Sequence, residues 1–258
     1  MSKTSKVIYA VLPVLSVITL IGVWTLLSIQ EGTLIPTPLE TWGRFLEIMT
    51  EPISKAILPV HVLVSLRRVL IAFLFAILLG ITTGVFFGWY PRIKALLSPI
   101  FELLRPIPPI AWIPLLILMF GIGELPKILL VFIGAFIPIV LNTQSGIESI
   151  DPMLIKAGQS FGCNRTQLLF HVALPAATPA ILAGIKMALS SGWMCVVAAE
   201  MIAARQGVGF LIVRGQEAGD TPLIVACMLV IGLVSFLLSA ILTKLEGVLC
   251  PWQFKKVK

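Results

Sequence analysis

The chain has 258 residues, of which 58% are apolar and only 12% are charged, and its formal net charge is +7. Soluble domains carry about 25% charged residues, so the composition excludes an ordinary soluble protein and favours a membrane protein. The basic residues lie in short segments between apolar runs and form no single stripe, so the positive charge does not indicate a nucleic-acid partner.

Apolar runs of membrane-spanning length occur along the whole chain. A spanning helix needs about 20 apolar residues, and four runs of that length contain no Asp, Glu, Lys or Arg. Two further segments are weaker, because one is rich in proline and the other contains Lys186 and Glu200. In chain order the six predicted spans are Val7–Gln30, Val69–Pro91, Pro106–Gly123, Ile128–Ile147, Pro179–Ala204 and Leu223–Thr243. We therefore expect an all-α, polytopic membrane protein with six transmembrane helices in one domain, residues 1–258.

The distribution of positive charge predicts the orientation. With six spans both termini lie on one side, and that side carries 12 of the Lys and Arg residues against 7 on the other. Because cytoplasmic loops are richer in Lys and Arg, both termini are expected in the cytoplasm. Arg67 and Arg68, at the outer mouth of the second span, count against this orientation. In the outer loop, the spacing of apolar residues between Pro38 and Pro52 predicts an amphipathic helix on the membrane surface.

The segment 148–178, between the fourth and fifth spans, predicts two short helices. Asp151 and Pro152 are typical of a helix start, and Gly162 is suited to end that helix in a left-handed conformation. Asn164, with Gln167 three positions later, resembles a capping box that starts a second helix, which we expect to end before Pro175. The apolar residues of this elbow either insert into a groove on a partner or pack on the chain's own helix ends; they are Ile155, Phe161, Leu168, Leu169 and Phe170.

Several spaced motifs resemble one family. The elbow reads K-A-G-x-x-x-G from Lys156 to Gly162 and then V-x-L-P, ending at Pro175. This is similar to the E-A-A-x-x-x-G loop of the membrane-spanning subunits of bacterial ABC importers, with Lys and Gly in place of the first Glu and the second Ala. The segments R-P-I-P-P-I-A-W-I-P-L from Arg105, F-G-I-G-E from Phe120, A-A-E-M-I-A-A from Ala198 and G-V-G-F from Gly207 resemble the branch that transports nitrate, taurine, alkanesulfonates and bicarbonate.

The resemblance implies a type I ABC importer permease fold and a set of partners. Residues 148–178 would be the cytoplasmic coupling-helix loop that docks on an ATPase subunit. The docking residues it implies are Lys156, Ala157, Gly158, Phe161, Gly162, Leu174 and Pro175. The implied assembly contains two ATPase subunits, which hold ATP and Mg²⁺, an extracytoplasmic solute-binding protein, and a second copy of this chain in a bacterial inner membrane. This chain has no G-x-x-x-x-G-K-[ST] sequence of its own, so we expect it to hold no cofactor and to catalyse no reaction.

Few polar residues inside the spans are candidates for the translocation path or a gate. Glu200 is the only carboxylate expected deep in a span, and we predict that it structures the outer gate, bonded to Arg205 or Arg67, or else caps a neighbouring backbone. Trp112 and Trp193 either line the path or pack and anchor in the membrane, and Arg105 precedes the proline-rich span. Neither His61 nor His171 is expected inside a span. Lys186 is expected to reach the cytoplasmic interface on its long side chain.

Two other functions remain open at this point. A stand-alone six-span carrier or channel would need its own gate or ion site and would not use the exposed elbow, and a membrane scaffold would need neither. For a permease of this branch the resemblance implies a small, anionic solute, and the similarity of R-P-I-P-P-I-A-W and F-G-I-G-E to the taurine subgroup favours taurine or a related sulfonate over nitrate, bicarbonate, cyanate and pyrimidine precursors.

Overall fold

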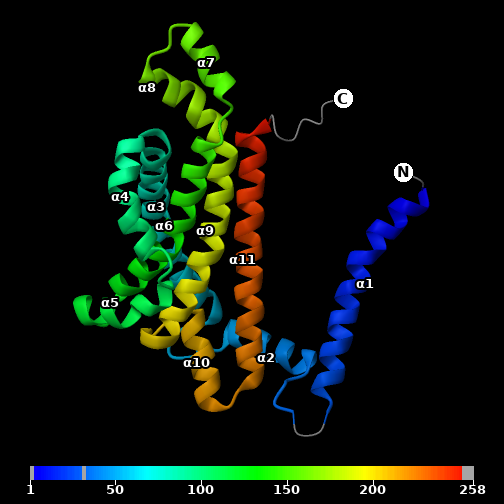
Figure 1. Ribbon diagram of the computed structural model, residues 1–258. Coiled ribbons are helices and arrows are strands. Elements are labelled where there is room, and N and C mark those ends of the chain that lie inside the picture. The colour runs from blue at the N-terminus through cyan, green and yellow to red at the C-terminus, as the bar shows by residue number, and fades with distance from the viewer. Residues whose placement is uncertain (1–2, 31–32, 252–258) are drawn as a thin grey trace.

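The computed structural model describes residues 3–30 and 33–251, and this part of the chain is almost entirely helical (Figure 1). Its elements are α1 (Lys3–Ser28), α2 (Pro38–Thr50), α3 (Leu58–Trp89), α4 (Pro91–Leu104), η1 (Pro109–Trp112), α5 (Ile113–Phe120), α6 (Glu124–Glu148), α7 (Pro152–Ser160), α8 (Arg165–Leu168), η2 (Leu169–Ala173), α9 (Leu174–Ala203), α10 (Val208–Ala218) and α11 (Thr221–Leu249).

Four continuous helices are long and apolar enough to cross a membrane: Leu58–Trp89, Glu124–Glu148, Arg165–Ala203 and Thr221–Leu249. α4 and the segment Pro109–Phe120 are together long and apolar enough for a fifth crossing, but they meet at an angle of 85°, as in a broken span or a re-entrant loop. α1 is apolar from Leu12 to Ser28, and the six-span prediction requires it as the remaining span. Figure 1 shows α1 standing apart from the other helices, which it joins through α2.

Two predictions in this part of the chain were wrong: the start of the second span and the loop at residues 92–105. α3 begins at Leu58, eleven residues before Val69, because the charge of Arg68 is neutralised inside the protein and does not end the helix. As a result His61, expected outside the spans, lies in α3 and is fully buried. Residues 92–105, expected as a loop, form most of α4, and the prolines at 106, 108 and 109 break the third span after it.

The second helix of the elbow was expected to end before Pro175, but it runs on into α9 without interruption. The five residues of η2 form a π-helix, in which the Leu174 N–H donates to the Leu169 carbonyl. Proline has no N–H to donate and its ring clashes with the carbonyl four residues back in an α-helix. The wider π-turn accommodates the proline without ending the helix. As a result α8, η2 and α9 form one continuous helix of 39 residues.

Close packing of α6 between α3 and α9 forms the core of the bundle. The approach depends on small residues: a Cβ added at Gly84 of α3 would lie 2.5 Å from Thr143 Cβ of α6. On the other side, a Cβ at Gly184 of α9 would lie 2.6 Å from Asn142 Cβ. Small residues let helix backbones approach closely in a membrane, so these positions set the spacing of the three helices.

The amphipathic helix predicted between Pro38 and Pro52 is confirmed as α2. Thr37 caps it in a reciprocal capping box with Glu40. Ile48 on its apolar face is buried against α10 and α11, whereas Leu39 is 81% exposed. The Arg44 Nε donates to Asp220 Oδ2 over 2.8 Å and ties α2 to the start of α11. One part of the apolar face therefore packs on the protein and another part stays uncovered.

Candidate functional site

The elbow between α6 and α9 has the local structure that its sequence predicts. Asp151 caps α7, with its Oδ1 accepting from the Met153 N–H over 2.8 Å. Gly162 has a φ of +80°, the left-handed conformation that ends α7. Asn164 and Gln167 form the predicted capping box of α8, with both hydrogen bonds at 2.8 Å. Figure 1 shows α7 and α8 projecting beyond one end of the bundle.

The apolar residues of the elbow divide between its interior and its surface. Leu168 and Leu169 are buried, and a Cβ added at Gly158 would lie 2.6 Å from Leu168 Cδ2, so glycine is what allows α7 and α8 to cross closely. Phe161 is 89% exposed at the tip. Lys156 and Ala157 are also exposed. The tip thus presents an aromatic ring to its surroundings, and α7 and α8 pack closely beneath it.

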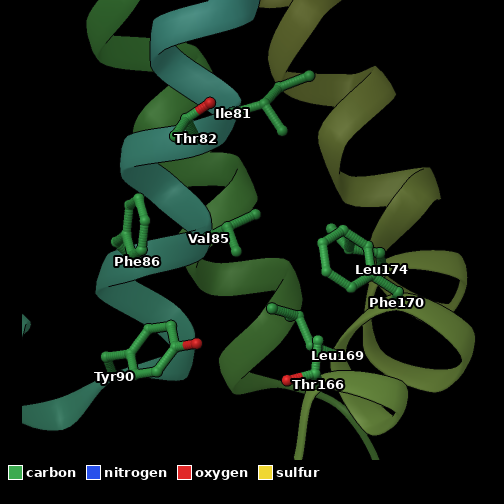
Figure 2. A pocket seen from close by; sticks show the side chains of 9 residues that line it. All are labelled: Ile81, Thr82, Val85, Phe86, Tyr90, Thr166, Leu169, Phe170 and Leu174. Carbon is green, nitrogen blue, oxygen red and sulfur yellow. The ribbon is translucent and has the colours of Figure 1, made fainter.

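The elbow is braced against the end of α3. The Arg165 guanidinium lies 5.1 Å from the centre of the Tyr90 ring, and its Nη2 donates to the Trp89 carbonyl over 3.3 Å. Beside this contact lies an apolar groove of about 350 Å³. Figure 2 shows Phe86 and Tyr90 on one side of it and Phe170 and Leu174 on the other. Pro175, the last residue of the predicted docking set, is exposed next to the groove.

Helix α8–η2–α9 connects the elbow to the opposite end of the bundle. Its 39 residues run from Arg165 to Ala203, a length of about 58 Å at 1.5 Å per residue. Glu200 lies in its last turn. A single continuous helix therefore links the elbow to the surroundings of Glu200.

Glu200 is buried at the far end of this helix and makes three hydrogen bonds. Its Oε1 accepts from Arg68 Nη1 at 2.7 Å, and its Oε2 accepts from Ser65 Oγ at 2.9 Å and from the Gly209 N–H at 3.0 Å. The carboxylate therefore both pairs with a charge on α3 and caps the start of α10. The expected partners Arg205 and Arg67 were wrong, because the Arg68 side chain reaches Glu200 across the α3–α9 interface.

Arg68 joins three helices at this end. Its Nε and Nη2 donate to the two carboxylate oxygens of Glu124, both at 2.7 Å, at the first residue of α6. Its Nη1 also donates to the Gln206 carbonyl at 2.8 Å. The Arg68 side chain is 3% exposed and Glu124 is 47% exposed. A buried guanidinium whose three nitrogens all donate hydrogen bonds has the geometry that offsets desolvation of its charge.

The G-V-G-F segment wraps around these groups. The Gly207 N–H donates to His61 Nδ1 at 3.1 Å, and the Val208 N–H donates to Ser65 Oγ at 3.0 Å. Gly207 has a φ of +127°, and a Cβ there would overlap the Glu200 carboxylate. His61 Nε2 lies 3.2 Å from the Ile53 carbonyl, so the imidazole bridges this segment to the loop before α3.

The remaining predicted path residues lie elsewhere. Trp193 is 3% exposed in the core cluster, a placement that favours packing, and Trp112 in η1 packs against the same cluster. Arg105 lies in the break after α4 and pairs with Glu102 at 3.1 Å. Lys186 pairs with Glu246 near the C-terminal end of α11.

Sequence reasoning missed Arg68, Ser65, His61 and Glu124. His61, Arg68 and Glu124 were assigned to loops because a charge or an imidazole next to an apolar run indicates the end of a span, and Ser65 lies in the same predicted loop as His61 and Arg68. For the three residues before Val69 the available signal was their regular spacing, because residues 61, 65 and 68 fall on one helical face.

These features define a class of protein, a polytopic permease with a projecting elbow. Residues 72–253 match the family described as binding-protein-dependent transport system inner membrane component, and the chain belongs to it. Its relatives are permease subunits of ABC transporters and not enzymes. The fold agrees: a chain of the MetNI methionine ABC transporter superposes with a TM-score of 0.63 at 18% identity, covering 72% of this chain and 92% of that one.

Three curated relatives illustrate the branch. The taurine transport system permease protein TauC of Escherichia coli is 38% identical, over 89% of this chain and 84% of its own length. The putative aliphatic sulfonates transport permease protein SsuC of Bacillus subtilis is 32% identical, over 91% and 84%. The nitrate import permease protein NrtB of Synechocystis is 29% identical, over 94% and 90%. The predicted branch, whose members carry nitrate, taurine and sulfonates, is confirmed.

Proposed function

We propose that this chain is the membrane-spanning subunit of an ATP-driven importer for a small anionic or zwitterionic solute, with taurine or a related sulfonate favoured. The importer would contain two ATPase subunits that bind ATP and Mg²⁺, an extracytoplasmic binding protein, and a second copy of this chain. The termini and the elbow would face the cytoplasm. The similarity to TauC at 38% identity supports the choice of solute over nitrate, bicarbonate, cyanate and pyrimidine precursors.

The observation that carries the proposal is the unbroken helix from the elbow to Glu200. An ATPase that docks on the elbow and moves it would turn or tilt α8–η2–α9 as a rigid body, and α6 and α3 pack against that helix. At its far end the motion acts on the ion pairs of Arg68 with Glu200 and Glu124. Rigid-body motion of helices between alternative packings is an established way to switch a membrane path.

The elbow's exposed ring provides the test. Phe161→Asp places a charge at the tip without disturbing the buried crossing of α7 and α8, since Phe161 is 89% exposed. Leu34→Asp is a matched control, because Leu34 is 83% exposed in the loop before α2. The tagged chain is co-expressed with the candidate ABC ATPase of its organism, and the ATPase recovered with it is quantified.

We expect wild type and Leu34→Asp to recover the ATPase and Phe161→Asp to lose it. Equal recovery by all three would remove the elbow as the docking surface. A chain that never binds an ATPase yet transports taurine in liposomes would instead be a stand-alone carrier.

A further inference from the structure

A broad basin opens at the end of the bundle opposite to α7 and α8, where α2, α5 and α10 lie (Figure 1). Its volume is about 1010 Å³. The loop before α3, the start of α6 and the loop between α9 and α10 contribute its walls. Basic side chains line it, namely Lys55, Arg68, Lys127, Arg205 and Arg214, against one carboxylate, Glu124.

The loop before α3 places one of these cations, Lys55, at the edge of the basin. Ile53 and Ala56 pair in an antiparallel bridge, and the two residues between them, Ser54 and Lys55, have φ of +52° and +72°. Such two-residue turns normally use Asn or Gly, because other residues are strained at positive φ. Strain of this kind persists where the surroundings impose it, often at functional positions. His61 Nε2 lies 3.2 Å from the Ile53 carbonyl and holds the start of this turn.

Arg68 forms the floor of the basin, and its two edges differ. The edge of the guanidinium that contacts Glu200 is shielded from solvent, because both side chains are at most 3% exposed. The edge that contacts Glu124 is accessible to solvent, because Glu124 is 47% exposed. Lys127, 7% exposed, also contacts Glu124, with its Nζ 3.2 Å from Oε1. Glu124 is thus an anion held by two buried cations on the side that faces the basin.

We propose that this basin is a binding site for the oxyanion of the solute, a sulfonate or carboxylate that displaces Glu124 from Arg68 and Lys127. A guanidinium edge binds two oxygens of a carboxylate or sulfonate in the same fork geometry that it uses for Glu124. The displaced Glu124 side chain rotates so that its carboxylate faces the solvent, since it is already half exposed. The two buried cations then keep an anionic partner, which is the bound oxyanion. Lys55 and Arg205 increase the local concentration of anions at the mouth.

This inference rests on the proposed function for the identity of the solute. If Glu124 competes with the solute, removing its charge strengthens binding, whereas disruption of a structural ion pair weakens it. Glu124→Gln is therefore expected to bind the anion about tenfold more tightly, which corresponds to about 1.4 kcal/mol. Lys127→Gln removes a contact with the bound anion and is expected to bind it about tenfold more weakly.

The experiment measures binding of methanesulfonate and taurine to the purified chain in lipid nanodiscs by isothermal titration calorimetry, with methylammonium as a cation control. Glu217→Gln is the matched charge control, because Glu217 pairs with Arg214 at the basin's wall but does not touch Arg68. Arg92→Gln serves as the basic control, because Arg92 lies in the first turn of α4, which follows the end of α3 away from the basin. Each variant is first checked for a single symmetric peak in size-exclusion chromatography, and Glu124→Ala replaces Glu124→Gln if the latter fails.

We expect tighter binding only in Glu124→Gln, weaker binding in Lys127→Gln and no change in Glu217→Gln or Arg92→Gln. An equal gain in anion affinity in Glu124→Gln and Glu217→Gln would show that only the overall charge matters, and it would overturn the proposal that the anion displaces Glu124. Unchanged or weaker binding in Glu124→Gln, or no anion binding in wild type, would overturn the site. The elbow experiment remains informative in each case, because ATPase recovery does not depend on the basin.

Discussion

Replacing Glu200 by Gln tests whether its charge stabilises the end of the bundle opposite to the elbow. The side chain keeps its shape, but the amide has only one acceptor oxygen, whereas the carboxylate accepts three hydrogen bonds from Ser65, Arg68 and Gly209. If the amide oxygen faces Arg68, its NH₂ group faces the Gly209 N–H; in the opposite orientation NH₂ faces the guanidinium. Each orientation places a donor against a donor.

The expected decrease in the free energy of unfolding follows from those contacts. Loss of a charge-assisted hydrogen bond costs about 1.5–3 kcal/mol, and a buried donor left unpaired costs about 1–3 kcal/mol. Because Arg68 keeps its two bonds to Glu124, we expect a loss near the lower part of the summed range, about 3 kcal/mol. At about 2–4 °C per kcal/mol for a chain of this size, the midpoint of thermal unfolding falls by about 6–12 °C.

The assay is thermal unfolding of the detergent-solubilised chain, followed by tryptophan fluorescence. Glu217→Gln is the control, because the Glu217 side chain is 57% exposed and pairs only with Arg214 among the described residues. A midpoint for Glu200→Gln indistinguishable from that control would show that the carboxylate is not a charged partner of Arg68. Normal assembly together with normal solute uptake would remove Glu200 from any gating role.

Three further substitutions test the packing and the ion pairs. Gly84→Val places methyl groups where α3 meets α6, and we expect a loss of about 1–3 kcal/mol from overpacking, seen as a lower unfolding midpoint; an unchanged midpoint would mean that the helices are not in close contact. Gly207→Ala should destabilise the chain more than Gly219→Ala, since both have positive φ but only at Gly207 would a Cβ overlap a buried carboxylate; equal losses in the same unfolding assay would contradict the placement of that loop. Lys186→Glu should lower the yield of folded chain by placing a second carboxylate beside Glu246 on α11, and the added exchange Glu246→Lys should restore it; failure of the double variant to recover would argue that the two side chains do not pair.

The sequence by itself determined the class of protein and the elbow. Long uncharged runs have one physical explanation, because only a bilayer makes such helices stable. Caps are equally local: Asp151, Gly162 and Asn164 act on backbone groups within three residues, so their signals could be read without knowing what surrounds them. The amphipathic α2 was predictable for the same reason.

The tertiary structure alone decided how the charged residues are used. A rule that ends each span at a charge assigned Arg68 and Glu124 to loops, since it counts a charge without its partner. Arg68 lies inside α3 because Glu200 and Glu124, 132 and 56 residues away along the chain, neutralise and bond it. Pro175 likewise continues a helix only because a π-turn precedes it. Contacts between residues far apart in sequence supply these compensations, and no local pattern contains them.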